Sequence, residues 1–336
     1  MINIGIIGYG YWGPNLVRNF NETSGINVSQ VADLDDKKLN KIRLRYPSIA
    51  VTTDADKIIK NMDIDAVVIA TPVSAHYELA LRSLKAGKHV LIEKPMADTS
   101  EKCEELIELA ERKNLLLMVD HTFPYTDAVR KIKELIKSGE LGEIFYYDSV
   151  RVNLGLFQHD VNVIWDLAVH DLSILEYLLQ QKPVSVSATG ISHITGQLEN
   201  VAYITLIFDN NLIAHIHVNW LSPVKIRRTL IGGDKKMLVY DDLVPTEKVK
   251  IYDKGIDMVI DDESIYQMRV GYRTGDMWSP NLDRTEALYR LTKHFRDCIV
   301  RNDEPITNSI SGLRVVQIME AATKSMSNNG HPEKLN

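Results

Sequence analysis

The chain has 336 residues, which is too many for one compact core and suits two domains. Its content of 45% hydrophobic and 25% charged residues is ordinary for a globular protein, and a net charge of −6 without a basic patch argues against nucleic-acid binding. The two cysteines, Cys103 and Cys298, form no metal or redox motif, so we expect no metal site and a cytoplasmic location. Apolar runs are too short for a membrane span, and we expect no signal peptide.

The first elements follow the order of a dinucleotide-binding unit. Residues 2–8 predict a strand, and Gly8, Gly10 and Gly13 then give the G-x-G-x-x-G spacing before a helix. The glycines allow a tight turn, the approach of a pyrophosphate and close packing of the helix, whose N–H groups face the phosphates. Asp33 ends the next strand, where an acidic residue binds ribose hydroxyls and repels a 2′-phosphate, so NAD is favoured over NADP. The alternative is a plain glycine turn with a helix-capping Asp nearby.

Strands and helices continue to alternate as far as residue 121. They are predicted in turn over residues 64–71, 74–86, 88–92, 100–113 and 115–121. This alternation predicts a parallel, doubly wound sheet in an NAD-binding Rossmann domain over residues 1–121. Ligands bind such sheets at the carboxyl ends of their strands. Because one strand ends in Glu93 and Lys94, we expect both side chains beside the cofactor.

Hairpin strands dominate the second domain, which we place over residues 122–336. The predicted elements, in chain order, are a helix, a strand, a second helix, five strands, a loop and two helices. They cover residues 127–138, 143–154, 164–180, 184–194, 200–208, 212–221, 226–232, 236–241, 253–283, 284–301 and 310–327. Tight turns such as Asp209-Asn210-Asn211 favour a largely antiparallel sheet. The fold class is therefore α/β, with a Rossmann sheet followed by an α+β domain.

A polar stripe marks the predicted helix over residues 164–180. Asp166 and His170 lie four residues apart, so their side chains are neighbours. An Asp beside a His suits proton transfer, because the carboxylate orients the ring and raises its basicity. Ser173 and Tyr177 continue the stripe, so a solvated helix face is the alternative.

The strand over residues 143–154 alternates polar with apolar side chains. Its polar set could bind a substrate or cover an exposed sheet face, and the pattern favours neither. The set comprises Ser149, Arg151 and Asn153.

Together these residues resemble the Gfo/Idh/MocA oxidoreductases, NAD(P)-dependent dehydrogenases and reductases of sugars, cyclitols and sugar nucleotides. The resemblance covers essentially the whole chain and rests on three motifs: GYGYWG at residues 8–13, Glu93-Lys94-Pro95, and D-x-x-x-H at Asp166 and His170. It implies a Rossmann domain followed by an α/β domain whose open-faced sheet often forms the oligomer interface. We therefore expect a homodimer or homotetramer.

The resemblance also implies roles for individual residues. It makes Lys94, Asp166 and His170 catalytic at the nicotinamide. With the residues already named, the cofactor set becomes Gly8, Tyr9, Gly10, Tyr11, Trp12, Gly13, Asp33, Thr71, Pro72, His76, Glu93, Lys94 and His121. The substrate set becomes Lys94, Arg151, Asn153, Asp166 and His170.

The stretch from His121 to Ile174 looks more like members that act in cell-surface polysaccharide pathways, some of which oxidise the 3-hydroxyl of a UDP-N-acetylhexosamine. His121 and Phe123 stand where some cyclitol dehydrogenases carry other residues, which argues against an inositol. We therefore expect a UDP-N-acetylhexosamine 3-dehydrogenase. Cations available for the diphosphate are Arg151, Lys225, Arg227 and Arg228.

In this reaction a base takes the hydroxyl proton as hydride leaves carbon. His170 is the expected base and Lys94 would stabilise the developing alkoxide, although Lys94 could carry the proton instead. Two alternatives stay open at this point: a dehydrogenase of a free sugar or cyclitol, and a non-catalytic NAD-binding regulator.

Overall fold

The computed structural model describes residues 1–155, 160–179, 181–194, 198–257 and 271–335. They form two compact units. The first unit joins Met1–Thr126 to Arg284–Gln317, and the second joins Asp127–Asp283 to Ile318–Asn336. Residues 284–317 therefore pack with the first unit, although the sequence pattern assigned them to the second domain. Among the described residues, no helix is long and apolar enough to cross a membrane.

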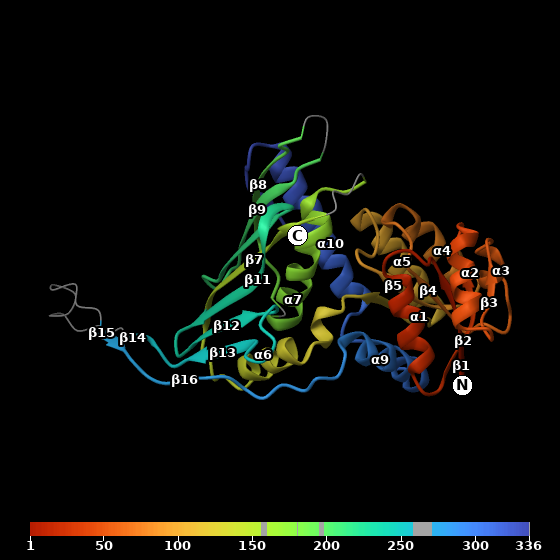
Figure 1. The fold of residues 1–336 in the computed structure, drawn as a ribbon. Coiled ribbons are helices and arrows are strands. Elements are labelled where there is room, and N and C mark those ends of the chain that lie inside the picture. The colour runs from red at the N-terminus through yellow and green to blue at the C-terminus, as the bar shows by residue number, and fades with distance from the viewer. Residues whose placement is uncertain (156–159, 180, 195–197, 258–270, 336) are drawn as a thin grey trace. The chain divides into compact units, whose positions relative to one another are not determined.

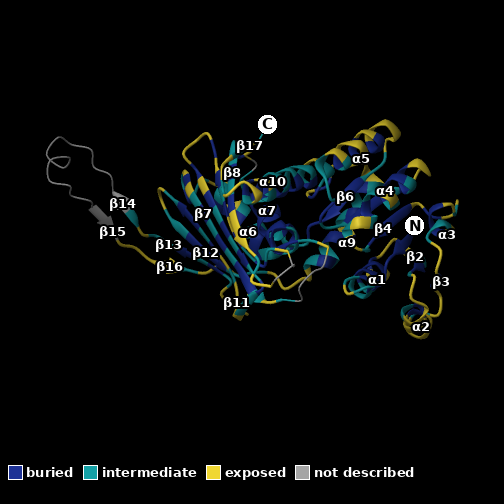
Figure 2. Ribbon diagram, turned by 90° about the horizontal axis from the view of Figure 1, so that it is seen from above, coloured by how far each residue is buried: buried dark blue, intermediate teal, exposed yellow. Residues whose placement is uncertain are grey.

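The first unit is built on a six-stranded parallel sheet in the order β3-β2-β1-β4-β5-β6, which confirms the predicted doubly wound topology (Figure 1). Its strands are β1 Ile2–Ile7, β2 Ile26–Ala32, β3 Ala50–Thr52, β4 Ala66–Ile69, β5 His89–Glu93 and β6 Leu117–Asp120. Strands β4 and β6 are buried along their whole length, as the dark strands of this sheet show in Figure 2. Such burial explains their continuous apolar runs.

Helices of the first unit are amphipathic and cover this sheet. They are α1 Gly13–Glu22, α2 Asp36–Arg45, α3 Asp56–Ile59, α4 His76–Lys85, α5 Ser100–Lys113 and α9 Ala287–Arg301, with 3₁₀ turns η1 Val73–Ala75 and η2 Phe123–Tyr125. Helix α5 has the predicted bounds because Thr99 accepts a hydrogen bond from the backbone of Lys102 and Asn114 ends the helix in the left-handed region, with φ 53°.

The second unit contains a nine-stranded sheet in the order β16-β13-β12-β11-β7-β10-β9-β8-β17. Only β10 and β7 pair in parallel among its described ladders, so the predicted antiparallel character is confirmed. The strands are β7 Ile144–Leu154, β8 Ser185–Ile191, β9 Val201–Ile207, β10 Ile213–Asn219, β11 Leu221–Gly233, β12 Met237–Asp241, β13 Val249–Tyr252, β16 Met277–Trp278 and β17 Glu333–Lys334.

The segment predicted as a loop over residues 253–283 contains short strands. Strand β14, Gly255–Asp257, pairs with β15, Gly271–Arg273, and β16 joins the main sheet. Residues 258–270 of the predicted loop lie outside the described residues.

Helices of the second unit pack on the nine-stranded sheet. They are α6 Asp127–Lys137 and α7 Val169–Leu179, together with the final part of α10, Ser309–Ser327. The predicted helix over residues 164–180 begins as a π-helical turn, η3 Ile164–Ala168, before α7 continues it. Residue 180 lies outside the described residues. Helix α7 packs on α6 and β7, and η3 packs on β10.

Candidate active site

The glycine loop between β1 and α1 leaves its backbone open to a ligand. Gly8 has φ 103° and a Cβ there would collide with the carbonyl of Ala70. A Cβ on Gly13 would lie 2.6 Å from the Gly8 carbonyl oxygen, so the helix could not pack as closely. A Cβ on Gly10 would have no described heavy atom within 4 Å, so a phosphate could approach the backbone there.

A cavity of about 690 Å³ lies beside this loop at the carboxyl ends of β1, β2 and β4. Its walls include Gly8, Gly10, Asp33, Thr71 and Pro72, five of the predicted cofactor residues. The Thr71 hydroxyl is buried and has no hydrogen-bond partner among the described residues. A bare glycine backbone, an acidic residue and a hydroxyl awaiting a partner together fit a bound dinucleotide.

The Asp33 carboxylate is held in place at the edge of this cavity. Its Oδ2 accepts a hydrogen bond of 2.6 Å from the backbone of Tyr9, and its Oδ1 accepts one of 2.9 Å from Asp35. The ammonium of Lys38 lies 3.5 Å from Oδ2, and Lys38 also lines the cavity. The place where the ribose is expected therefore contains a cation as well as the predicted carboxylate.

Other residues of the predicted cofactor set differ in exposure. Tyr9 is buried, with 6% of its surface exposed, whereas Tyr11 is 91% exposed. His76 is buried, and its ring nitrogens each lie 2.8 Å from a carbonyl oxygen, those of Thr71 and Pro95. Burial lowers the pKa of His76. His76 thus ties the segment after β4 to the segment after β5.

A cluster of ionisable side chains lies at the carboxyl ends of β5 and β6. The parallel register sets Glu93 opposite Asp120, and Lys94 and His121 follow them. Trp12, from the glycine loop, donates a hydrogen bond of 3.2 Å from Nε1 to Asp120 Oδ2. Thus two neighbouring carboxylates, a lysine, a histidine and the glycine loop meet at the end of the sheet where the cofactor is expected.

Burial governs the protonation of this cluster. It raises the pKa of Glu93 well above its usual value, with the Asp120 carboxylate adding to the effect. It raises the pKa of Asp120 to about 6, against the hydrogen bonds from Thr122 and Trp12. Burial, aided by the Lys94 cation, lowers the pKa of His121 to about 3, so its ring is neutral near pH 7.

The His121 ring also awaits a partner. It is 2% exposed, and neither of its nitrogens has a hydrogen-bond partner among the described residues. An unsatisfied buried polar group is costly, so a ligand group beside it would be stabilised. This fits the predicted place of His121 at the cofactor.

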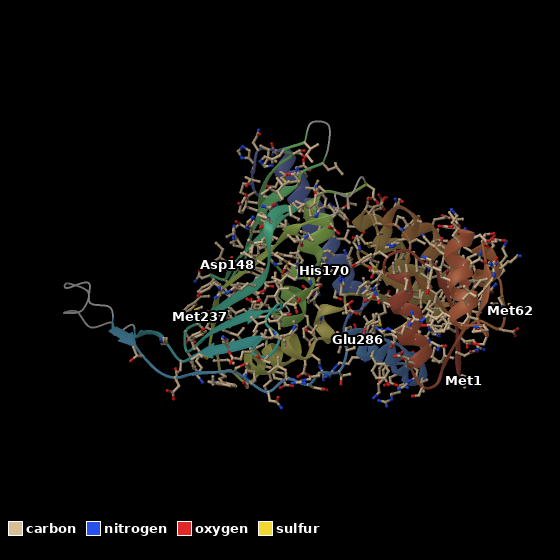
Figure 3. All side chains as sticks on the ribbon, in the orientation of Figure 1. Met1, Met62, Asp148, His170, Met237 and Glu286 are labelled. Atoms are coloured by element: carbon tan, nitrogen blue, oxygen red, sulfur yellow. The ribbon has the colours of Figure 1, made fainter. Side chains whose placement is uncertain are left out.

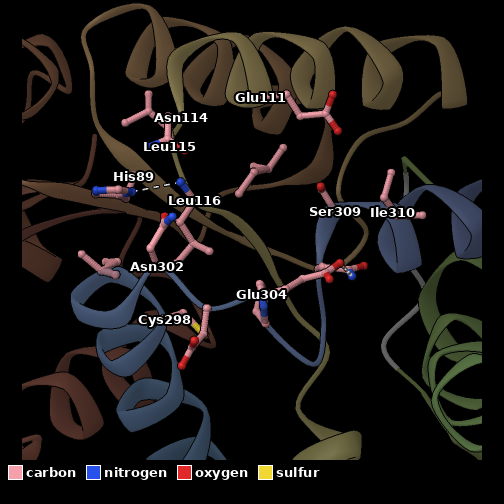
Figure 4. A pocket seen from close by; sticks show the side chains of 15 residues that line it. His89, Glu111, Asn114, Leu115, Leu116, Cys298, Asn302, Glu304, Ser309 and Ile310 are labelled. Carbon is pink, nitrogen blue, oxygen red and sulfur yellow. Dashed lines mark hydrogen bonds between the residues drawn. The ribbon is translucent and has the colours of Figure 1, made fainter.

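A second pocket, of about 250 Å³, lies at the amino ends of strands β5 and β6 of the same sheet (Figure 4). It is lined where β5 begins and where α5 and α9 end, and includes His89, Glu111 and Asn302. His89 Nδ1 accepts a hydrogen bond of 2.9 Å from the backbone of Leu116. Since ligands of doubly wound sheets bind at carboxyl ends, this pocket is not part of the cofactor site.

Asp166 and His170 lie in the second unit, at the start of the helix that packs on β7 and β10 (Figure 3 labels His170). Asp166 sits in the π-helical turn, a wide turn that often occurs at functional sites. Its Oδ2 accepts a hydrogen bond of 3.0 Å from Nε1 of Trp220. Both Asp166 and His170 are partly exposed, whereas Ser173 further along the stripe is buried, so the stripe is not solvated along its whole length.

Arg151 does not have the predicted substrate-binding geometry. Its side chain is 3% exposed and forms a buried ion pair with Asp171, at 2.6 Å from Nε to Oδ2. Ser149 donates a further hydrogen bond of 2.7 Å to Asp171 Oδ1. The polar side of β7 thus faces α7 and anchors that helix, because a buried guanidinium requires a carboxylate partner. Neither the substrate interpretation nor the exposed-face interpretation holds for Arg151.

The other predicted substrate groups differ in placement. Asn153 is partly exposed, and its Nδ2 lies near Gly155, next to the ring of Trp220. Arg227 is paired with Asp242 at 3.4 Å, whereas Lys225 and Arg228 are exposed. Residues 156–159, within the stretch that resembles polysaccharide-pathway members, lie outside the described residues.

The predicted catalytic residues are divided between the units, with Lys94 in the first and Asp166 and His170 in the second. Their meeting at one nicotinamide stays a prediction.

Three polar residues that contact the predicted site residues were not predicted from the sequence: Asp120, Lys38 and Trp220. Strand register could have indicated Asp120, since it pairs with Glu93, but Trp220 carries no sequence signal. Among the described residues, no group of three or more His, Cys, Asp or Glu side chains could hold a metal ion.

Comparison with known proteins finds a matching family model in each unit. Residues 2–121 match the GFO/IDH/MocA oxidoreductase family with an NAD-binding Rossmann fold, and residues 129–239 match the GFO/IDH/MocA C-terminal domain. A solved structure of UDP-N-acetylglucosamine 3-dehydrogenase GnnA from Acidithiobacillus ferrooxidans has the same fold. Its TM-score is 0.80 at 23% identity, over 97% of this chain and 99% of that chain.

Curated relatives differ in what they act on. The UDP-N-acetylglucosamine 3-dehydrogenase of Acidithiobacillus ferrooxidans is 26% identical over 329 residues, 93% of each chain. Inositol 2-dehydrogenase 2 of Saccharopolyspora erythraea is 29% identical over 242 residues, 69% of this chain and 71% of the relative. This chain spans 57% and 61% of the length of two further curated relatives. The two matched domains, which follow one another over most of the chain, show that it belongs to the GFO/IDH/MocA family of NAD(P)-binding oxidoreductases.

Proposed function

We propose that this chain is an NAD-dependent dehydrogenase that oxidises a ring secondary hydroxyl of a UDP-N-acetylhexosamine, at C3. The oxidoreductase chemistry is supported by the ionisable cluster around Lys94 at the cofactor end of the sheet. The substrate is supported by the relative that matches along 93% of both chains, a UDP-N-acetylglucosamine 3-dehydrogenase. NAD is supported by the carboxylate of Asp33 in the ribose site.

The residues of the chain would divide the work as follows. The nicotinamide, when bound, accepts the hydride. His170 would take the hydroxyl proton, and Asp166 would orient His170 or hold a neighbouring hydroxyl. Lys94 would place its charge beside the developing alkoxide. The glycine loop and Asp33 would hold the dinucleotide, and the buried neutral ring of His121 would offer hydrogen bonds to it.

Asn153 is the remaining polar candidate for the sugar on β7, since Arg151 is committed to Asp171. A cation for the diphosphate would come from the exposed Lys225. A diphosphate bound in this way would supply remote binding energy that helps to position the sugar.

A second candidate is a dehydrogenase of a free sugar or cyclitol. It is favoured by the inositol 2-dehydrogenase 2 relative, which is slightly more similar, at 29% identity, but over a smaller share of the chain, 69%. The two candidates differ in whether the nucleotide contributes to catalysis.

The first prediction separates these candidates. The rate is measured from the absorbance of the NADH formed. UDP-N-acetylglucosamine is expected to give a kcat/KM at least about tenfold above those of N-acetylglucosamine, glucose and myo-inositol. The free sugars and the inositol lack the diphosphate and its charge-assisted hydrogen bonds. If a free sugar or inositol equals or exceeds every UDP-sugar, the nucleotide-sugar proposal fails and the second candidate takes its place.

We also propose that the chain is a homo-oligomer that pairs through the face of the nine-stranded sheet turned away from α7. This face carries exposed apolar side chains, among them Tyr203, Ile207 and Ile213, which are 44%, 42% and 44% exposed. Ile207 and Ile213 are register neighbours on β9 and β10. Apolar side chains gathered on a sheet face are typical of a protein–protein contact.

The second prediction tests this interface. The double variant Ile207→Asp, Ile213→Asp is expected to be monomeric by light scattering after gel filtration, because two carboxylates would be buried without partners. Thr205→Asp, between Tyr203 and Ile207 on the same face of β9, tests whether a single charge suffices. A wild type that is itself monomeric at micromolar concentration contradicts the proposal.

A further inference from the structure

Asp166 is held by a tryptophan that the sequence motifs do not include. Trp220 follows β10 and precedes β11, and its ring is 1% exposed. Its Nε1 donates to Asp166 Oδ2 at 3.0 Å. An indole N–H can only donate, and it is fixed to a rigid ring, so it presents one donor in one direction.

The Trp220 ring is itself fixed by the backbone around it. The Trp220 N–H donates to the carbonyl of Asn200 at 2.9 Å, and the Trp220 carbonyl accepts from Gly155 at 3.0 Å. A Cβ on Gly155 would lie 2.6 Å from Cδ1 of the indole, so the glycine makes room for the ring. The indole therefore has little freedom to move away from Asp166.

The turn that carries Asp166 is fixed independently. Asn162 accepts hydrogen bonds through Oδ1 from the backbone of Ile164 and Trp165, and its carbonyl accepts from the Asp166 N–H at 3.2 Å. A partly exposed carboxylate on a fixed turn can still adopt several side-chain rotamers. A rigid donor at one oxygen selects one orientation of the carboxylate.

From this geometry we propose that Trp220 is a positioning residue that orients the Asp166 carboxylate for the reaction at the sugar. The inference rests on the proposed function for its catalytic consequence, but not for the hydrogen bond itself. Trp220 would act through Asp166 and need not touch substrate or cofactor. Removal of its N–H should therefore lower kcat, while the affinity for NAD, which binds the first unit, should stay the same.

The decisive substitution changes the N–H alone. Replacing Trp220 by β-(3-benzothienyl)alanine keeps the shape of the ring and puts a sulfur in place of Nε1–H. Loss of a hydrogen bond to a charged group predicts a fall in kcat of roughly tenfold. In an Asp166→Ala background the same replacement should change kcat by less than about twofold, because the group through which it acts is gone.

Trp165 supplies a matched control. Its Nε1 also makes a hydrogen bond of 3.0 Å, to Thr323 Oγ1, in the same unit. Benzothienylalanine at position 165 should leave kcat within about twofold of wild type. An equal loss at both positions would mean a general loosening of the turn and would overturn the proposal. Gly155→Ala, which displaces the ring from the other side, should lower kcat as the change at Trp220 does.

An indole-¹⁵N NMR spectrum tests the bond without any substrate. The Trp220 Nε1–H resonance, assigned from the position-220 variant, should shift on Asp166→Ala while that of Trp165 stays in place. If it does not shift, Trp220 does not hold Asp166 and the proposal is wrong. If wild type turns over no sugar, the proposed function fails, and this spectrum still decides whether the two side chains are joined.

Discussion

Alanine at Lys94 or His170 is expected to lower kcat at least about a hundredfold, the usual loss when a proton-transfer group is removed. His170 would otherwise take the hydroxyl proton, and Lys94 would balance the charge that develops on the oxygen. Both variants should still bind NAD, because the glycine loop and Asp33 are unchanged. The measurement is steady-state kcat on the best substrate of the screen, with NAD affinity from quenching of protein fluorescence.

The same strand offers a control for the lysine. Lys88 precedes β5 at its opposite end and donates hydrogen bonds of 2.7 Å and 2.6 Å to the carbonyls of Asn61 and Ile64. Lys88→Ala should lower the melting temperature, since it leaves buried carbonyls without donors, yet leave kcat close to wild type. For the helix, Tyr177→Phe changes the same stripe as His170 and should leave kcat close to wild type. If Lys94→Ala and His170→Ala both keep kcat within tenfold of wild type, neither residue is catalytic.

The sequence predicted the first unit better than the second for a physical reason. Its parallel strands are buried on both faces and give continuous apolar runs, and glycine is required where Gly8 takes φ 103°. Helix α2 and the short strand β3 escaped prediction because they carry few buried residues. Chain order also gave the wrong unit for α9, because this helix belongs to the first unit although it follows most strands of the second sheet in the sequence.

The second unit shows where a pattern of polar residues is ambiguous. Alternation on β7 identified Ser149 and Arg151 as one face but not which side was buried. An arginine is commonly exposed, and the carboxylate of Asp171, twenty residues away on α7, stabilises Arg151 in a buried position. Helical spacing likewise predicted Asp166 beside His170, without the π-helical turn that changes the direction of the first side chain.

Some polar partners of the candidate residues come from loops and strand ends distant in sequence. Trp220 reaches Asp166 across 54 residues, and Trp12 reaches Asp120 across 108. A sequence motif joins residues at fixed short spacings, whereas these contacts depend on the register and the order of the strands in the sheets. Polar partners of this kind therefore become visible only with the fold.

The second large effect concerns the preference for NAD over NADP, and Lys38 is expected to increase that effect. Asp33→Ala removes the carboxylate that would accept the ribose hydroxyls and repel a 2′-phosphate, and it leaves the ammonium of Lys38, now 3.5 Å from Asp33 Oδ2, without that counter-charge. The ratio of kcat/KM for NAD to that for NADP is expected to fall by at least about a hundredfold, since a charged hydrogen bond is lost for one cofactor and a charge repulsion for the other.

Two further variants separate the causes of that change. Asp33 also accepts the Tyr9 N–H, so its loss should weaken both cofactors by loosening the glycine loop, and the ratio removes this shared effect. Asp33→Asn, which keeps an acceptor oxygen but not the charge, should give an intermediate ratio. Adding Lys38→Ala to Asp33→Ala should restore part of the preference for NAD, because the cation that attracts the 2′-phosphate is gone. An Asp33→Ala enzyme with the wild-type ratio would show that Asp33 does not read the ribose.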